Sequence, residues 1–305
     1  MMKRGYILGL FFLAVASCTK KETAPAPIPI TPLQVLVNSD STLSYYHRLI
    51  ILANETGLLA DDTVTLLIPT NSAFRAAGYT QSFIDSLQTS AAGNLVRYLF
   101  IPFRTNVPNT DSTAYTPYAT LSGYSIYGMP NSQGILFNGA QAVRDTARSG
   151  KAQVYRLNAT LSAPVDSLPD YLASDTSLTF LAEAFRRTNL YDSLLLSGNY
   201  TLLAPVNSAF MNAGYDSLPA IDSADLGSLI RLLEYHVATG VRFANTLAAA
   251  SPLMTIEGGT IDVTIVSGGI QFTGNNNTVP ALLLQGDQMV GSRIVVQRIS
   301  QLLLP

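Results

Sequence analysis

The decapeptide TLLIPTNSAF, residues 65–74, returns as TLLAPVNSAF at residues 201–210. Extending the comparison to residues 65–80 and 201–216 gives identity at 11 of 16 positions. A match of this length at a separation of 136 residues indicates that the chain carries two copies of one structural unit.

Each copy is predicted to be a joint between a strand and a helix. In the second copy the apolar run before Pro205 predicts a buried strand, which the proline ends because it lacks an N–H. Asn207 or Ser208 is predicted to cap a helix that begins at Ala209, and Phe210 then enters the core from its first turn. Pro205, Asn207 and Phe210 are therefore predicted to be structural. The same prediction holds for their counterparts in the first copy, Pro69, Asn71 and Phe74.

Both joints are flanked by similar patterns. Apolar residues at three- and four-residue spacing predict helices before and after each joint. Alternating residues and a glycine pair in TIDVTIVSGGIQF, from Thr260, predict a hairpin, and each copy closes with a β-rich run into proline, at Pro164 and Pro305. These patterns predict an α+β fold with two tandem domains, each a β-sandwich or wedge with several helices, at residues 33–166 and 167–305.

The N-terminus is typical of an exported lipoprotein. A basic pair, an apolar run and small residues in MMKRGYILGLFFLAVASC predict a signal peptide over residues 1–17. The end of this segment resembles the lipobox of bacterial lipoproteins, so Cys18, the single cysteine, is predicted to be lipidated and to anchor the chain in a membrane. An ordinary signal cleavage nearby is the alternative. Residues 18–32 are proline-rich and are predicted to form a tether.

Composition excludes several classes of partner. Without residues 1–17 the chain has 16 basic and 20 acidic residues, and no basic cluster favours nucleic acid. Downstream of the signal no apolar run reaches the length of a membrane-spanning helix. Thr19 is not the aspartate that in such lipoproteins tends to mark inner-membrane retention. We therefore expect an outer-membrane lipoprotein, on its periplasmic face or at the cell surface.

Three blocks of the second copy together resemble the fasciclin domain family. They are TLLAPVNSAF at the joint, LLEYHVATG from Leu232, and SRIVVQRISQLLLP at the end. The first copy departs from the family pattern, because RYLFIPF has Leu99 where the family has histidine. The resemblance implies a fasciclin-like domain in each copy, with the first one divergent.

The resemblance also suggests Tyr235 and His236 as a candidate binding site, since this region has been associated with integrin recognition in animal members. The alternative is that both residues end a helix, with the imidazole hydrogen-bonded to nearby backbone and the phenol half-buried. Four tyrosines of the first copy form the other candidate ligand site, Tyr115, Tyr118, Tyr124 and Tyr127. Tyrosine suits the recognition of glycans or proteins, but it also suits cross-strand packing.

Catalysis has no positive support in the sequence. The chain has two histidines, one cysteine, no G-x-S-x-G elbow and no HExxH spacing. Acidic pairs such as Asp222 and Asp225 lack the spacing of a calcium loop, so we expect them to cap helices. No cofactor or metal is predicted.

The sequence thus favours a non-enzymatic cell-envelope adhesion or interaction lipoprotein that binds a surface protein or glycan. The alternative is an accessory carbohydrate-binding lipoprotein of a glycan-uptake system, in which the tyrosines would hold an oligosaccharide.

Overall fold

A computed structural model describes residues 30–105, 115–145, 150–191 and 198–305. The signal peptide, Cys18 and almost all of the tether lie outside these residues. The first helix among the described residues is α1 (Pro32–Ser39). Below, the first repeat means residues 33–166 and the second repeat means residues 167–305.

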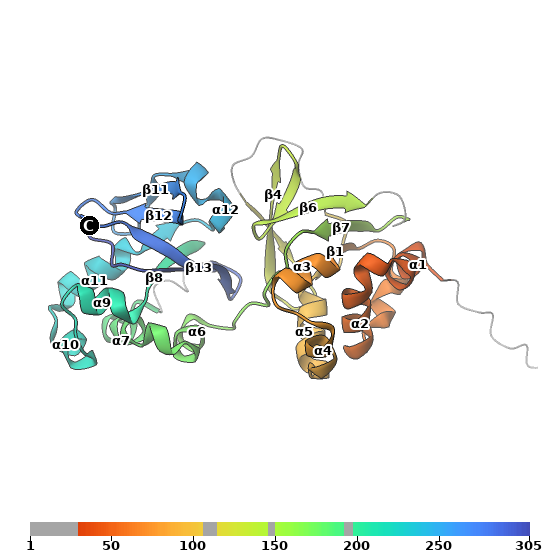
Figure 1. The fold of residues 1–305 in the computed structure, drawn as a ribbon, viewed down its shortest axis with the longest axis horizontal. Helices are drawn as coiled ribbons and strands as arrows, with labels where there is room; N and C mark the ends of the chain where they lie inside the picture. Colours follow the sequence, from red (N-terminus) through yellow and green to blue (C-terminus); the bar gives the residue numbers. More distant parts are fainter. Residues whose placement is uncertain (1–29, 106–114, 146–149, 192–197) are drawn as a thin grey trace, which may run out of the picture. The chain divides into compact units, whose positions relative to one another are not determined.

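The first repeat builds one sheet and the helices that cover it (Figure 1). Its further helices are α2 (Ser44–Leu52), α3 (Asn71–Ala76), α4 (Gln81–Ser86) and α5 (Thr89–Tyr98), with short 3₁₀ turns at Ser41–Leu43 and Thr56–Ala60. Its strands are β1 (Thr65–Pro69), β2 (Phe100–Ile101), β3 (Thr116–Ala119), β4 (Ser125–Asn131), β5 (Gly134–Phe137), β6 (Ala140–Asp145) and β7 (Gln153–Leu157). The strand order is β2-β1-β7-β6-β5-β4-β3.

The second repeat follows the same plan. Its helices are α6 (Leu168–Ser174), α7 (Thr179–Thr188), α9 (Asn207–Asn212), α10 (Leu218–Ser223), α11 (Leu226–Tyr235) and α12 (Ala244–Leu247), with 3₁₀ turns at Thr176–Leu178 and Ala248–Ala250. Its strands are β8 (Tyr200–Pro205), β9 (Val237–Thr239), β10 (Leu253–Met254), β11 (Thr260–Val266), β12 (Gly269–Thr273), β13 (Ala281–Val290) and β14 (Ile294–Ile299). Their order is β10-β11-β12-β13-β14-β8-β9.

Both sheets place the joint strand in the same surroundings. β1 runs parallel to the closing strand β7 and antiparallel to the short β2, and β8 does the same between β14 and β9. The other strand pairs are antiparallel. The predicted α+β fold is confirmed. The predicted hairpin is also present, with Ile265 opposite Ile270 and a two-residue turn at Ser267 and Gly268.

The core of each repeat forms where the joint strand meets its helices. In the first repeat Leu66 and Ile68 of β1 are fully buried together with Phe74 of α3. In the second repeat Leu202 and Phe210 occupy the matching positions. The apolar run before each proline is thus buried on both faces, which explains why it does not alternate with polar residues.

The last residues of the joints also repeat their geometry. The glycines at 78 and 214 have φ of 82° and 93°, a left-handed conformation that glycine adopts without a steric cost. The tyrosine that follows each glycine meets the joint phenylalanine edge-on, with ring centroids 5.7 Å apart in the first repeat and 6.1 Å apart in the second. The glycine therefore ends the helix so that the tyrosine turns back onto the core.

Candidate functional site

The asparagine of the second joint does not cap the helix predicted for it. That helix, α9, begins at Asn207 itself, and no side chain caps it. Asn207 instead accepts a hydrogen bond from the backbone N–H of Phe180 at 3.0 Å, in the first turn of α7. Its amide donates to the Thr176 carbonyl and to the Thr179 hydroxyl, each at 2.9 Å. Asn207 therefore caps the preceding helix, α7, and not α9.

The first joint makes the same connection with different neighbours. Asn71 accepts from the backbone N–H of Tyr45 at 3.0 Å and donates to the Ser41 carbonyl and the Ser44 hydroxyl, at 2.8 Å and 2.9 Å. Here α3 has its own cap, because the Thr70 hydroxyl accepts from Ala73 N–H. One asparagine per repeat thus ties the joint to the helix before it, α2 or α7.

A second repeated contact was not predicted. Arg156 of β7 donates to Asp40 at 2.8 Å, and Arg298 of β14 pairs in the same way with Asp175. Each aspartate also caps a 3₁₀ turn, and its hydrogen bonds hold the carboxyl pKa below its usual range, for Asp40 at about 2. The signal in the sequence was the pair of stretches SDSTL and SDTSL, at residues 39–43 and 174–178, each followed far downstream by a closing-strand arginine.

The predicted ligand pair Tyr235 and His236 lies at the end of α11, where both side chains contact backbone. The His236 ring is fully buried, with Nδ1 2.8 Å from the Leu232 carbonyl and Nε2 accepting from Leu303 N–H at 2.9 Å. These partners require the proton on Nδ1. The Tyr235 hydroxyl donates to the Thr260 carbonyl and accepts from Asn275 N–H at 3.0 Å. The geometry favours the structural alternative for both residues.

Burial also determines the charge of the imidazole. Desolvation lowers the pKa of His236 to about 4, and the hydrogen bond to the Leu232 carbonyl offsets only part of that shift. The ring is therefore neutral near pH 7 and holds the C-terminal segment through Leu303.

Two of the four tyrosines in the predicted ligand site are largely buried. Tyr118 is 7% exposed and packs edge-on against Phe137, with centroids 6.4 Å apart. Tyr127 is 2% exposed, and its hydroxyl donates to the Ser292 carbonyl at 2.6 Å. Burial raises the pKa of both phenols. These placements favour packing over ligand binding at both positions.

The other two tyrosines also have partners within the chain. Tyr115 meets Phe243 edge-on, with centroids 5.0 Å apart, and burial raises its pKa to about 12. Tyr124 is half-buried, and its hydroxyl donates to the Asp166 carboxylate, which raises the pKa of the phenol. The structure therefore does not gather the four side chains into one open patch. Their predicted role in ligand binding stays a prediction.

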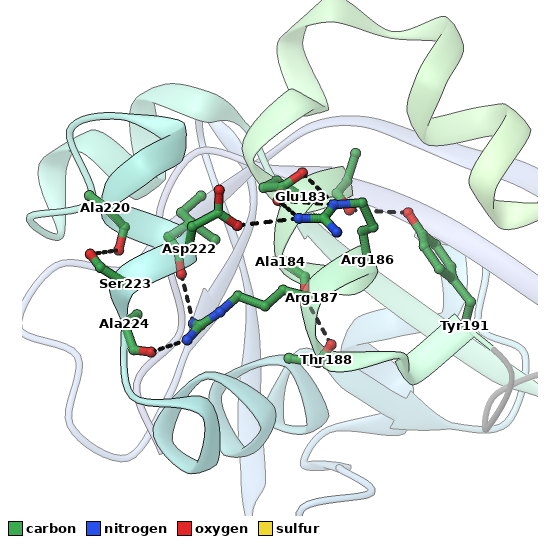
Figure 2. Close-up of polar contacts among 12 residues, drawn as sticks. Glu183, Ala184, Arg186, Arg187, Thr188, Tyr191, Ala220, Asp222, Ser223 and Ala224 are labelled. Atoms are coloured by element: carbon green, nitrogen blue, oxygen red, sulfur yellow. Dashed lines mark hydrogen bonds and ion pairs between the residues drawn. The ribbon is translucent and has the colours of Figure 1, made fainter.

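A cluster of charged side chains lies on α7 and α10 of the second repeat (Figure 2). Arg186 donates to both carboxylate oxygens of Glu183, at 3.0 Å and 2.9 Å from Nε, and reaches Asp222 at 3.3 Å. Its neighbour Arg187 also reaches α10, where it donates to the Ile221 carbonyl. Both arginines thus connect α7 to α10.

The pKa values of the two carboxyl groups in this cluster shift in opposite directions. Hydrogen bonding to Arg186 lowers the pKa of Glu183, whereas the neighbouring Glu183 raises the pKa of Asp222. Asp225 is an ordinary helix cap and accepts from Ser228 N–H at 2.8 Å. Among the described residues no three His, Cys, Asp or Glu side chains are grouped to hold a metal ion.

Two cavities of about 340 Å³ lie elsewhere. One is lined by Ala209, Asn212, Ala213, residues 277–279, Gln301, Leu302 and Leu304. The other is lined by residues 138–140, 158–162 and Asp287. Burial raises the pKa of Asp287, whose carboxylate accepts from Ala244 N–H and the Gln297 amide at 2.7 Å and 2.8 Å. That carboxylate therefore ties α12 to β13.

Comparison with known proteins finds a family model that is similar to the second repeat. The Fasciclin domain model matches residues 176–305, which include the joint, the helix end at Tyr235 and the closing strand. Residues 176–305 are therefore similar to the Fasciclin domain family. The match begins after α6 and runs to the last residue of the chain.

Two curated relatives extend the similarity beyond this segment. Transforming growth factor-beta-induced protein ig-h3 of Sus scrofa is 24% identical over 288 residues, covering 92% of this chain and 40% of the relative. Human periostin is 22% identical over 172 residues, covering 56% of this chain and 20% of the relative. The chain thus spans less than half the length of these relatives.

Among solved structures, the chain is similar to a FAS1 domain pair from the insect cell adhesion molecule fasciclin I. The TM-score is 0.42 at 16% identity, with 86% of this chain and 96% of that chain covered. In the parts of the chain that the structure describes, no helix has the length and apolar character needed to cross a membrane.

Proposed function

We propose that this chain is a non-enzymatic adhesion or interaction protein of the cell envelope, which binds a protein or glycan on a surface. The observation that carries the proposal is the similarity of residues 176–305 to the Fasciclin domain family. The surroundings of His236 support it, because both ring nitrogens are occupied by backbone groups and neither is available for proton transfer to a substrate.

Membrane attachment through Cys18 is part of the same proposal. Its support is the lipobox-like sequence at residues 15–18, which lies outside the described residues. Replacing Cys18 with serine is expected to abolish incorporation of a labelled fatty acid and to release the chain from the membrane fraction. Label that persists in this variant would contradict the anchor, whatever the chain binds.

Adhesion itself is tested with beads that carry the whole chain. We expect these beads to attach to surfaces coated with envelope proteins or glycans, and attachment to require a folded second repeat. Phe210→Ala, which destabilises that repeat, should reduce attachment, whereas Thr264→Lys, an exposed change on β11, should leave it intact. Attachment no greater than that of beads without the chain, on every coated surface, would contradict the proposal.

The carbohydrate-binding alternative depended on the four tyrosines of the first repeat. With Tyr118 and Tyr127 buried, the partly exposed members are Tyr115 and Tyr124, and Tyr115 packs against Phe243. A glycan array with Tyr124→Ala would favour the alternative if binding is present in the native chain and lost in the variant. No other observation favours it.

A further inference from the structure

The β11–β12 hairpin of the second repeat ends in an uncovered strand edge. β10 pairs with β11 at Thr260 and Ile261, and β12 covers the other side of β11 from Asp262 to Val266. Beyond Ile261 the β10 side of β11 is therefore the edge of the sheet.

The backbone direction along this edge follows from one hydrogen bond. Val263 N–H points outward, because it donates to the Ser251 hydroxyl at 2.9 Å. Alternate residues of a strand direct their N–H and C=O groups to the same side. Ile265 therefore directs both groups outward too, and beyond Val263 no strand among the described residues covers them.

The side chain of Ile265 at this open edge is apolar and exposed. Ile265 is 74% exposed, although Val263, on the same face of β11, is 5% exposed and belongs to the core. Its cross-strand neighbour Ile270 packs partly against that core. The apolar face of the sheet thus continues past the end of the core and stops at Ile265.

Natural sheets usually protect such an edge with lysine, proline or an inward-pointing charge. The edge strand β3 of the first sheet carries Pro117. On β11 the Ser251 hydroxyl blocks the Val263 N–H, but residues 264–267, Thr-Ile-Val-Ser, contain neither a charge nor a proline. The edge is therefore open over a short stretch centred on Ile265.

The geometry points to a second copy of this chain as the occupant, paired antiparallel through β11. A two-fold axis at Ile265 would let the two Ile265 residues exchange both of their backbone hydrogen bonds and cover each other's side chains. Thr264 would then lie opposite Val266, and Asp262 opposite Gly268, so no like charges meet. An axis at Val263 is excluded, since its N–H is already bonded and β10 occupies the adjacent edge.

The pairing is short, so we expect weak self-association rather than a permanent dimer. It does not depend on the proposed adhesion function, because it uses a strand edge and requires no surface ligand. Failure of the bead assay would leave it standing, and absence of self-association would leave the bead assay unaffected.

Disulfide trapping tests the register. Cys18 is the native cysteine, so Ile265→Cys in a Cys18→Ser background places a sole thiol on the proposed axis. Paired Cα atoms there would be about 5.5 Å apart, within disulfide range. Asp262→Cys is the matched control on the same strand, because its two copies would be six residues out of register, about 20 Å apart. We expect a disulfide dimer with cysteine at 265 and little at 262. Equal yields, or no dimer at 265, would overturn the inference.

Sedimentation of the whole chain provides the second measurement. Ile265→Lys should weaken self-association at least tenfold, because it places two ammonium groups face to face. Thr264→Lys adds the same charge at an exposed residue on the opposite face and should change self-association much less. Equal effects of the two variants, or a native chain that stays monomeric at every concentration, would contradict pairing through this edge.

Discussion

In the first repeat Leu99 follows the tyrosine at the end of α5, whereas in the second repeat His236 follows the tyrosine at the end of α11. Both side chains are fully buried, and both carbonyls accept a hydrogen bond from the joint strand, from Leu67 and Leu203. The main chain thus makes the same hydrogen bond to the joint strand in both repeats. The histidine adds two side-chain bonds to backbone and a group that titrates.

The outer face of the helices differs in a similar way. In the first repeat Arg48 of α2 pairs with Asp85 of α4 at 2.6 Å. At the matching positions the second repeat has two carboxylates, Glu183 and Asp222, and Arg186 lies between them. The joint is therefore constant, while the helix surface and the helix end are where the repeats diverge. The repeated residues therefore form the framework of this chain.

The largest expected effect is loss of a joint phenylalanine. Phe74→Ala and Phe210→Ala should each lower the free energy of unfolding by about 3–5 kcal/mol, because both rings are fully buried. Urea unfolding measures the loss. Phe103→Ala, at a ring that is 43% exposed, is the control and should cost clearly less. A large loss of unfolding free energy in one variant and a small loss in the other would show that the two joints are not equivalent.

His236 should make the second repeat sensitive to acid. Its folded pKa of about 4 lies below the value of 6.5 for an exposed histidine, so between these pH values the unfolded chain binds a proton that the folded chain does not. Stability is therefore full above about pH 6.5 and falls as the pH drops towards 4, by about 3 kcal/mol in total.

Urea unfolding of the native chain and of His236→Leu across this pH range checks that prediction. The variant copies the first repeat and should lose the pH slope, although it leaves the Leu303 N–H without its partner and costs stability at pH 7. An unchanged slope would show that other groups cause the acid sensitivity.

A smaller effect is expected from the charged cluster. Glu183→Arg restores the arrangement of the first repeat, in which an arginine of the earlier helix faces the aspartate of α4. It removes the neighbour that raises the pKa of Asp222, so that pKa should fall. Carboxyl chemical shifts followed through a pH titration measure the change. Glu234→Arg, a substitution on α11, serves as the control and should leave the pKa of Asp222 in place.

Sequence reasoning found the elements of the fold because their signals are local. The apolar run, the proline and the glycine of each joint lie within 16 residues. It assigned the asparagine cap to the wrong helix because the true partner of Asn207 lies 27 residues upstream. The pair between Arg298 and Asp175 spans 123 residues, so no local rule points to it.

The candidate sites were harder to predict than the fold. A tyrosine has an apolar ring and a polar hydroxyl, so the sequence cannot decide between a surface patch and a buried ring with a bonded hydroxyl. For Tyr127 the decision comes from Ser292, 165 residues away. The resemblance to fasciclin domains located His236 correctly at a helix end, but its burial depends on the C-terminal segment that reaches Nε2.

One asparagine per repeat holds the joint to the helix before it. Amide hydrogen exchange tests this directly, because Asn71 protects the N–H of Tyr45 and Asn207 protects the N–H of Phe180. Asn207→Ala should speed exchange at Phe180 and leave Tyr45 unchanged, and Asn71→Ala should do the reverse to a similar extent. Each variant should lose about 1 kcal/mol of stability, as is typical of a lost helix cap. If either variant leaves its own amide as protected as in the native chain, the two joints do not work in the way described.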